Sequence, residues 1–528
     1  MYRILSILIS LILLNCNDGE KTDVPIPISS SNPEAISFFR EAEINRASYE
    51  FIEAKENYLS AIKLDSNFIL AHNNIIAVLG DYNQVQYHRK KVSELIINSN
   101  DFEKLLIKWF NHPRSGSHNY KERLQIADKI MELYPESSES YYIYARTSAE
   151  NSSSADRAKA INALEKSLSI NKNNVLATEL LLALKFAGQG NAYKLKNDIE
   201  LYEEFDKYSR ELENEFPNSR LILSRIANIY RNSYNYSDQS RYELAEAKFK
   251  ALMTILDQVK SSSKGLMMTR FSLLYTTTGN LEKSLDIIDE SIKYSENDTD
   301  LIERNFFKIR TLIYFAKYLE AINLLNDFEN QILSSKIDKN LTLKSLIGIY
   351  NFKAIIFAHA NRSEEAFESF KAFKTYSADL LSYNNIDTDN SDQILEFISN
   401  NQLLSQSQTR WSRITGYHHD QDEIWINILV GNHDEADKLI NKFNYNYNND
   451  LLPFRGILSI MKGDVSQGYE ILKETNNVYF RYFLAQAMIN LGMKDDAKNV
   501  LDIIRKYPFV FFDSSFVIKG ASDLYDSL

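Results

Sequence analysis

The side chains best suited to chemistry stand together in segment 418–423, which reads HHDQDE. Two imidazoles and three carboxylates are ligand types that bind divalent metal ions. Adjacent histidines do not share a helical face, however, and metal sites usually draw ligands from distant segments. The pattern around His418 and His419 therefore favours an exposed loop between helices over a metal site. His112 and His118, in HPRSGSH, are also interpreted as loop residues.

Catalytic motifs are missing from the sequence. With only 15 glycines among 528 residues, the chain contains no phosphate-binding loop and no dinucleotide-binding fingerprint. It also has no nucleophile-elbow serine and no HExxH motif. We therefore expect a protein that is not an enzyme, and we predict no catalytic, cofactor-binding or metal-ligating residue and no cofactor.

Cys16, the only cysteine in the chain, ends an apolar leader that reads MYRILSILISLILLNC. Arg3 gives the leader a basic start, and Ile4–Leu14 is an apolar run of 11 residues. Such a run is too short to span a bilayer comfortably and is typical of a secretory signal. The end of the leader, Leu13–Cys16, resembles the lipobox of bacterial lipoproteins, although Asn15 departs from the usual Gly, Ala or Ser.

This lipobox resemblance implies a signal peptide over residues 1–15 and a lipid, including palmitate, on Cys16. A lone cysteine cannot form an internal disulfide, which agrees with that role. The alternative interpretation is an uncleaved anchor helix. Residues 16–34 are polar and rich in Pro and Ser, so we predict a flexible tether. We expect an exported protein on a bacterial membrane, the outer membrane being favoured over the inner, with a periplasmic or surface face.

A recurring helical pattern accounts for the rest of the chain. A small residue is followed four positions later by a large apolar one, and three positions after that by another small or apolar residue. The cases are Ala54-Tyr58-Ala61, Ser284-Ile288-Ser291, Ala366-Phe370-Phe373, Ala436-Ile440-Phe443 and Ala497-Leu501-Ile504. These offsets lie on one face of a helix. Their recurrence near about 34 residues predicts a solenoid of helix pairs that bury their faces against neighbouring pairs.

The chain resembles the tetratricopeptide repeat (TPR) family, with its best single match between Phe271 and Ser291. The family has a small residue inside each first helix, a left-handed residue in the turn that follows, and a proline closing the second helix. The matches are Ala42, Ala145, Ala227, Ala354 and Ala485 in first helices; Gly279, Gly431, Gly463, Gly492 and the substitute Asn361 in turns; and Pro135 and Pro217 at closing positions. The resemblance implies an all-α, right-handed α-α superhelix of about ten to twelve helix pairs.

We place this array at residues 35–525, with N-terminal and C-terminal sub-arrays expected at 35–260 and 261–525. The 15 glycines and 8 prolines suit a nearly all-helical chain with short turns. Trp109, Trp411 and Trp425 are interpreted as packing residues rather than as a ligand cage.

Net charge limits the class of partner. The formal charge of −11 argues against nonspecific nucleic-acid binding, and the one basic run, 88–91, is interpreted as a solvated helix face. The TPR resemblance implies that first helices line a concave surface that binds a peptide, a helix or a protein. Tyr141, Tyr142, Asn228 and Tyr230 lie on first helices, with core packing an equally good interpretation for the tyrosines.

The function that we expect is a membrane-anchored scaffold or adaptor for protein–protein interactions in the bacterial cell envelope. The alternative is a sensor module that binds a small ligand or a signal peptide. The predicted partner is a protein or peptide, and the lipid supplies the contact with the membrane.

Overall fold

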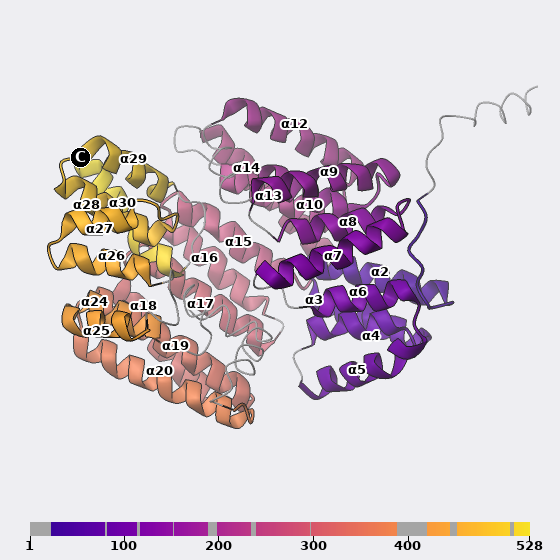
Figure 1. The fold of residues 1–528 in the computed structure, drawn as a ribbon, viewed down its shortest axis with the longest axis horizontal. Coiled ribbons are helices and arrows are strands. Elements are labelled where there is room, and N and C mark those ends of the chain that lie inside the picture. The colour runs from indigo at the N-terminus through magenta and orange to yellow at the C-terminus, as the bar shows by residue number, and fades with distance from the viewer. Residues whose placement is uncertain are drawn as a thin grey trace, which may run out of the picture. The chain divides into compact units, whose positions relative to one another are not determined.

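The computed structural model describes residues 23–79, 82–112, 117–150, 153–187, 198–233, 239–295, 297–387, 420–443, 451–506 and 512–528. These residues form α-helices, short 3-10 turns and loops, with no strand among them. Most described helices pack against the next one along the chain, as in the pairs α2 (Pro33–Ala47) and α3 (Phe51–Leu64), α8 (Ser138–Ser148) and α9 (Ser154–Ile170), α15 (Lys264–Thr277) and α16 (Leu281–Lys293), and α19 (Lys339–His359) and α20 (Ser363–Tyr383) (Figure 1). The predicted fold class, an all-α TPR-like solenoid, is confirmed.

The chain divides into two compact units. The N-terminal unit comprises residues 1–229 and 254–263, and the C-terminal unit comprises residues 230–253 and 264–528. Two helices, α13 (Arg220–Ser233) and α14 (Gln239–Gln258), contribute residues to both units.

The N-terminal unit begins with the pair α2 and α3. Its described helices are α2 (Pro33–Ala47), α3 (Phe51–Leu64), α4 (Ile69–Ile75) with η1 (Ile76–Val78), α5 (Tyr82–Leu95) with η2 (Ile96–Asn98), α6 (Asp101–Asn111), α7 (Ser117–Leu133), α8 (Ser138–Ser148), α9 (Ser154–Ile170), α10 (Val175–Phe186) and α12 (Ile199–Glu215).

The C-terminal unit continues the same pattern and ends with the single helix α30. Its described helices are α15 (Lys264–Thr277), α16 (Leu281–Lys293), α17 (Asp298–Tyr314), α18 (Tyr318–Ser334), α19 (Lys339–His359), α20 (Ser363–Tyr383), α24 (Asp420–Leu429), α25 (His433–Phe443), α26 (Leu452–Met461), α27 (Val465–Leu472), α28 (Val478–Asn490), α29 (Lys494–Arg505) and α30 (Phe512–Ser527).

Small side chains lie where paired helices meet, as the TPR resemblance implies. Ala42, Ala145, Ala354 and Ala485 are completely buried, and Ala227 is 1% exposed. In the pair α15 and α16, serine replaces alanine. There the hydroxyl of Ser284 lies 2.7 Å from that of Thr276 and 3.1 Å from the carbonyl oxygen of Ser272, so the buried polar atoms pair across the contact.

The turn inside a pair is a Schellman turn built around one residue with positive φ. The predicted turn residues are confirmed, with φ of 82°, 82°, 92°, 82° and 56° at Gly279, Gly431, Gly463, Gly492 and Asn361. The next N–H donates to the carbonyl five positions earlier, as from Asn280 to Tyr275 at 2.8 Å. This bond satisfies a carbonyl at the end of the first helix. Ala316 and Tyr49 take the same turn position with φ of 55° and 65°.

Helix α19 is largely buried within the C-terminal unit. Among the described residues it is the one helix long and apolar enough to cross a membrane, but 78% of its apolar window is buried inside the structure. It packs against α18 and α20 and contributes to a hydrophobic core that extends from Ile302 to Ala521. The apolar composition of α19 is therefore that of a helix buried in a protein core.

Part of the predicted flexible tether lies against the N-terminal unit instead of extending freely. Ile26 is 4% exposed and packs in a cluster with Phe102 and Trp109. Its neighbours Pro25 and Pro27 restrict the backbone to extended conformations, so little entropy opposes its docking. Residues 24–28 read Val-Pro-Ile-Pro-Ile, with an apolar side chain at every second position. The polar composition of residues 16–34 as a whole does not indicate this apolar pattern.

Candidate binding surface

A hydrogen-bond network around Glu43 joins the first two helix pairs of the N-terminal unit. Glu43 of α2 accepts hydrogen bonds from Arg46 (Nη2–Oε2, 2.6 Å) and from Asn74 of α4 (Nδ2–Oε1, 2.8 Å). The hydroxyl of Tyr58, on α3, also donates to Glu43. Burial opposes ionisation of Glu43, but the Arg46 charge and these hydrogen bonds hold its pKa below the usual 4.5. Glu43 is therefore a carboxylate at neutral pH.

The same network reaches α6 through a row of amides. Asn73 donates to Asn74 (Nδ2–Oδ1, 2.9 Å), and Asn111 at the end of α6 donates to Asn73 (Nδ2–Oδ1, 2.9 Å). Asn73 and Asn74 are buried, whereas Asn111 is exposed and Arg46 is half-buried. The network thus spans three successive first helices, α2, α4 and α6, and reaches the surface at the amide of Asn111, whereas the side chain of Arg46 is only 16% exposed. An exposed amide can bind the backbone of a peptide.

Trp109 lies next to this surface between two arginines. It is 3% exposed, and its indole N–H donates to Thr147 Oγ1 at 2.7 Å. The guanidinium groups of Arg123 and Arg146 lie 4.8 Å and 5.3 Å from the centre of its ring. Arg123 is fully buried and pairs with both carboxylate oxygens of Glu150, at 3.0 Å and 2.8 Å. The prediction that Trp109 is a packing residue is confirmed.

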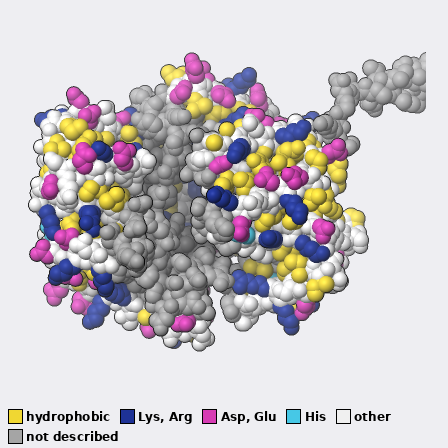
Figure 2. Space-filling view, viewed as in Figure 1, with side chains coloured by type: hydrophobic (Ala, Val, Ile, Leu, Met, Phe, Trp, Pro, Cys, Tyr) yellow, Lys and Arg dark blue, Asp and Glu magenta, His cyan; other side chains and the backbone are white. Residues whose placement is uncertain are grey.

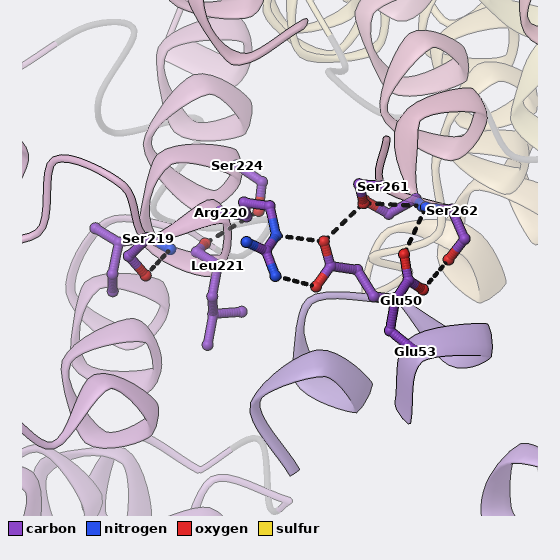
Figure 3. Close-up of polar contacts among 10 residues, drawn as sticks. Glu50, Glu53, Ser219, Arg220, Leu221, Ser224, Ser261 and Ser262 are labelled. Atoms are coloured by element: carbon purple, nitrogen blue, oxygen red, sulfur yellow. Dashed lines mark hydrogen bonds and ion pairs between the residues drawn. The ribbon is translucent and has the colours of Figure 1, made fainter. Parts of the chain in front are cut away.

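A second polar cluster connects the start of the N-terminal unit with its end (Figure 3). Glu50, in the turn between α2 and α3, is completely buried. Its carboxylate accepts from Arg220 of α13 at 2.5 Å and 2.9 Å, and from the Ser261 hydroxyl at 2.6 Å. Glu53 accepts from the backbone N–H of Ser262 at 2.8 Å. These bonds join positions up to 211 residues apart, so we assign the cluster to structure rather than to ligand binding.

Two histidines face each other between α4 and α5. Nδ1 of His72 lies 2.8 Å from Nδ1 of His88, and both rings are buried. Nε2 of His72 lies 3.1 Å from the carbonyl oxygen of Ser66. A carbonyl can only accept, so neutral His72 carries its hydrogen on Nε2 and accepts from His88 at Nδ1. Burial lowers the pKa of His72, and burial together with His72 lowers the pKa of His88 to about 4.

In the C-terminal unit, first helices meet around an aromatic cluster. Trp425 of α24 is 1% exposed and donates its indole N–H to the hydroxyl of Tyr479 on α28 at 2.7 Å. Phe516 of α30 stacks on His359 of α19, with ring centres 4.1 Å apart, and meets Trp425 edge-on at 6.3 Å. Burial lowers the pKa of His359 to about 3, so its ring is neutral.

Helix α30 completes this packing because it contacts α17, α28 and α29. The sequence predicts that first helices line a concave binding surface. Around the aromatic cluster their side chains instead form core, and they are not available to a partner. The network of the N-terminal unit is therefore the better candidate for a binding surface. The prediction that Trp425 is a packing residue is confirmed.

Four residues singled out in the sequence lie outside the described part of the chain: the predicted lipidation site Cys16, the predicted loop residues His418 and His419, and Trp411. Segment 418–423 is not wholly a loop, because α24 begins at Asp420. Within it, Asp422 is 1% exposed, and Glu423 lies 3.3 Å from Lys374. The described ranges contain no group of three or more His, Cys, Asp or Glu placed to hold a metal ion.

The remaining interpretations divide between core and surface. Tyr230 is completely buried and Asn228 is 9% exposed, whereas Tyr141 and Tyr142 are partly exposed. His112 follows α6 in the chain, but His118 belongs to α7 and not to a loop. In the basic run, Arg89 and Lys90 are exposed as predicted, yet His88 is buried. The sequence did not indicate the histidine pair, because the basic residues that follow His88 suggested that this whole part of α5 faces solvent.

Charged side chains give no single-sign surface on the face shown in Figure 2. Acidic and basic groups are interspersed over the visible parts of each unit. Recognition on this face would therefore depend on local hydrogen bonds and shape more than on a broad electrostatic field.

No family model matches the chain. A search of curated proteins also finds no match. Among solved structures it is similar to the APC/C heterotetramer Cut9–Hcn1 (13% identity, TM-score 0.29, 94% of this chain and 96% of that chain). It is also similar to the human IFIT1 dimer with PPP-AAAA (13%, 0.29, 84% and 94%). A third likeness is to Naa15/Naa10 bound to HypK-THB (14%, 0.22), where it covers 77% of this chain but only 64% of that chain. At these values the likenesses carry no functional argument, and the fold class rests on the helix pairs themselves.

Proposed function

We propose that this chain is a lipid-anchored scaffold for protein–protein interactions in the bacterial cell envelope, and not an enzyme. The observation that supports this proposal best is the network from Glu43 to Asn111, which crosses three first helices and ends at the exposed amide of Asn111. Polar groups placed on successive repeats suit a partner that extends along the array. The leader that ends at Cys16 supports the anchor.

A photo-crosslinking experiment tests the scaffold. A crosslinking amino acid would replace Asn111, and the matched control would replace Lys90, whose side chain is 79% exposed on the second helix α5. Crosslinking would be performed in cells of the source bacterium, followed by extraction in mild detergent. We expect one protein to be captured from position 111 and not from position 90. Equal capture of many proteins from both positions would contradict the proposal.

The same experiment separates a scaffold from a sensor. A scaffold should bring down its protein partner in stoichiometric amount, whereas a small-ligand sensor should copurify without one. Arg46→Ala or Asn111→Ala should reduce recovery of the partner about fivefold each, since loss of one interface contact commonly costs about 1 kcal/mol. Unchanged recovery with both variants would remove the network from the binding surface.

A further inference from the structure

The chain's own residues 23–30 run in an extended course along one edge of the N-terminal unit, the indigo stretch at the right of that unit in Figure 1. The course begins at Asp23. Its carboxylate accepts from the backbone N–H and hydroxyl of Ser138, both at 3.0 Å, and from Asn171 Nδ2 at 2.8 Å. Ser138 is the first residue of α8, so Asp23 also meets the positive end of a helix.

The middle of the segment is held by backbone pairing and burial. The N–H of Val24 donates to the carbonyl oxygen of Glu136 at 3.3 Å. Two residues later, Ile26 enters the cluster of Phe102 and Ile130, where it is 4% exposed. Removal of this apolar side chain from water stabilises the docked segment.

The far end of the segment is fixed at α6. The carbonyl oxygen of Pro27 accepts from Asn100 Nδ2 at 3.1 Å. Ser29 donates its N–H and its hydroxyl to Oε1 of Glu103, at 2.9 Å and 2.8 Å. Glu103 is completely buried and belongs to the capping box of α6, so its carboxylate needs these donors. The segment is therefore bound along its whole course from α8 to α6.

This docking shortens the connection to Cys16. Only residues 17–22 separate Cys16 from Asp23, and seven fully extended residues reach about 25 Å. If the connection were free as far as Pro33, seventeen residues would reach about 60 Å. The lipid is thus kept close to the point where Asp23 meets Ser138 and Asn171.

We propose that residues 23–30 form a clasp that holds one edge of the N-terminal unit against the lipid bilayer. This edge is formed by residues 136–138 and 171–174, and its exposed Lys172 and Asn173 would face the phospholipid headgroups. The inference rests on the lipidation of Cys16 contained in the proposed function. It gives the anchored protein a defined orientation, which a flexible tether would not.

Energy transfer to labelled lipids tests the clasp. The full lipidated protein would be reconstituted in phospholipid vesicles that carry an acceptor dye. A donor dye would be attached through Lys172→Cys, because acylation leaves Cys16 without a free thiol. The matched control carries the donor at Lys90→Cys on α5, which lies apart from α9 in the N-terminal unit (Figure 1). We expect stronger transfer from position 172 than from position 90.

Two further variants release the edge from the bilayer. Asp23→Ala combined with Ser29→Ala weakens the docking of residues 23–30, and a flexible insertion between residues 20 and 21 lengthens the connection to Cys16 while residues 23–30 stay docked on the unit. Transfer from position 172 should fall by at least about half in the insertion variant, whose connection exceeds 25 Å. The insertion also covers the case in which the double variant unfolds.

The outcomes are distinguishable. Equal transfer from positions 172 and 90, or transfer that the insertion leaves unchanged, overturns the clasp but leaves the lipid anchor in place. Failure of the purified protein to float with vesicles overturns the anchor, and the clasp with it.

Discussion

The turn between the two helices of a pair shows how a single residue determines local stability. Glycine occupies this position in four described turns, but Ala316 adopts the same left-handed conformation with φ of 55°. A Cβ atom is unfavourable there by about 1 kcal/mol, since it crowds the following carbonyl oxygen. The residue type at this position therefore affects stability without changing any tertiary contact.

We predict that Ala316→Gly stabilises the C-terminal unit by about 0.5–1 kcal/mol. The reverse change, Gly279→Ala, should destabilise it by about 1 kcal/mol, because the φ of 82° is strained for alanine even though no atom beyond the adjacent residues lies within 4 Å of the added Cβ. Urea unfolding followed by circular dichroism measures both changes. A loss of stability in Ala316→Gly would show that helix propensity outweighs turn geometry.

The histidine pair gives the N-terminal unit a predicted pH dependence. The folded pKa of His88 is about 4, below the usual 6.5, so folding favours the neutral ring. The stabilisation is present above pH 6.5 and is lost as the pH falls towards 4. We expect the free energy of unfolding to decrease by on the order of 2 kcal/mol over this interval. Lys91 and Asp65 also act on His72, with opposite effects on its pKa.

His88→Phe separates this effect from the titration of carboxylates. The variant retains an apolar ring but cannot accept a proton, so its stability should depend less on pH between 6.5 and 4 than that of the unaltered protein. Denaturant unfolding at several pH values makes the comparison. Parallel pH profiles for the two proteins would contradict the role assigned to the pair.

At the level of helices, the contact between α28 and α29 is sensitive to side-chain volume. Ala485 and Ala497 are both completely buried, so Ala485→Leu should overpack the contact and cost about 1–3 kcal/mol. The change should reduce hydrogen-exchange protection in α28, α29 and α30, and also in α17, because α30 contacts both α28 and α17. Ala360→Leu, at an exposed position, is the control. Loss of protection that includes the N-terminal unit would contradict the separation of the two units.

The helix pairs could be predicted from sequence because their signals are local. A small residue inside a helix and a glycine after it each specify one contact or one turn, as at Ala354 and Gly431. The turn at Tyr49 could not be predicted, since tertiary packing there overrides the preference of a bulky residue against positive φ. Residues 23–30 and the aromatic cluster around Phe516 were also missed. Both depend on contacts between positions far apart in the chain, which no periodicity records.

At the scale of the whole molecule, the lipid anchor stays a prediction that one substitution can test. Cys16→Ser should move the protein from the membrane fraction to the soluble fraction, because a serine hydroxyl cannot replace the acylated thiol. Stable anchoring needs more than one acyl chain, as in bacterial lipoproteins. Fractionation after a carbonate wash, with blotting for the protein, gives the result. Retention of the variant on membranes would favour the uncleaved anchor helix.

The position of α30 affects the order in which the C-terminal unit can fold. Helix α30 supplies Phe516 to a cluster whose other rings come from residues 359, 425 and 479, and it contacts α17 some two hundred positions earlier in the chain. An open repeat array can fold progressively from either end as it emerges. This unit cannot complete its folding until its last segment is present. The entropy cost of closing so long a loop must be met before the contacts that offset it can form. If the chain is exported as we propose, the aromatic rings stay exposed until α30 has crossed the membrane, and a chain cut before α30 would present them to proteases and chaperones.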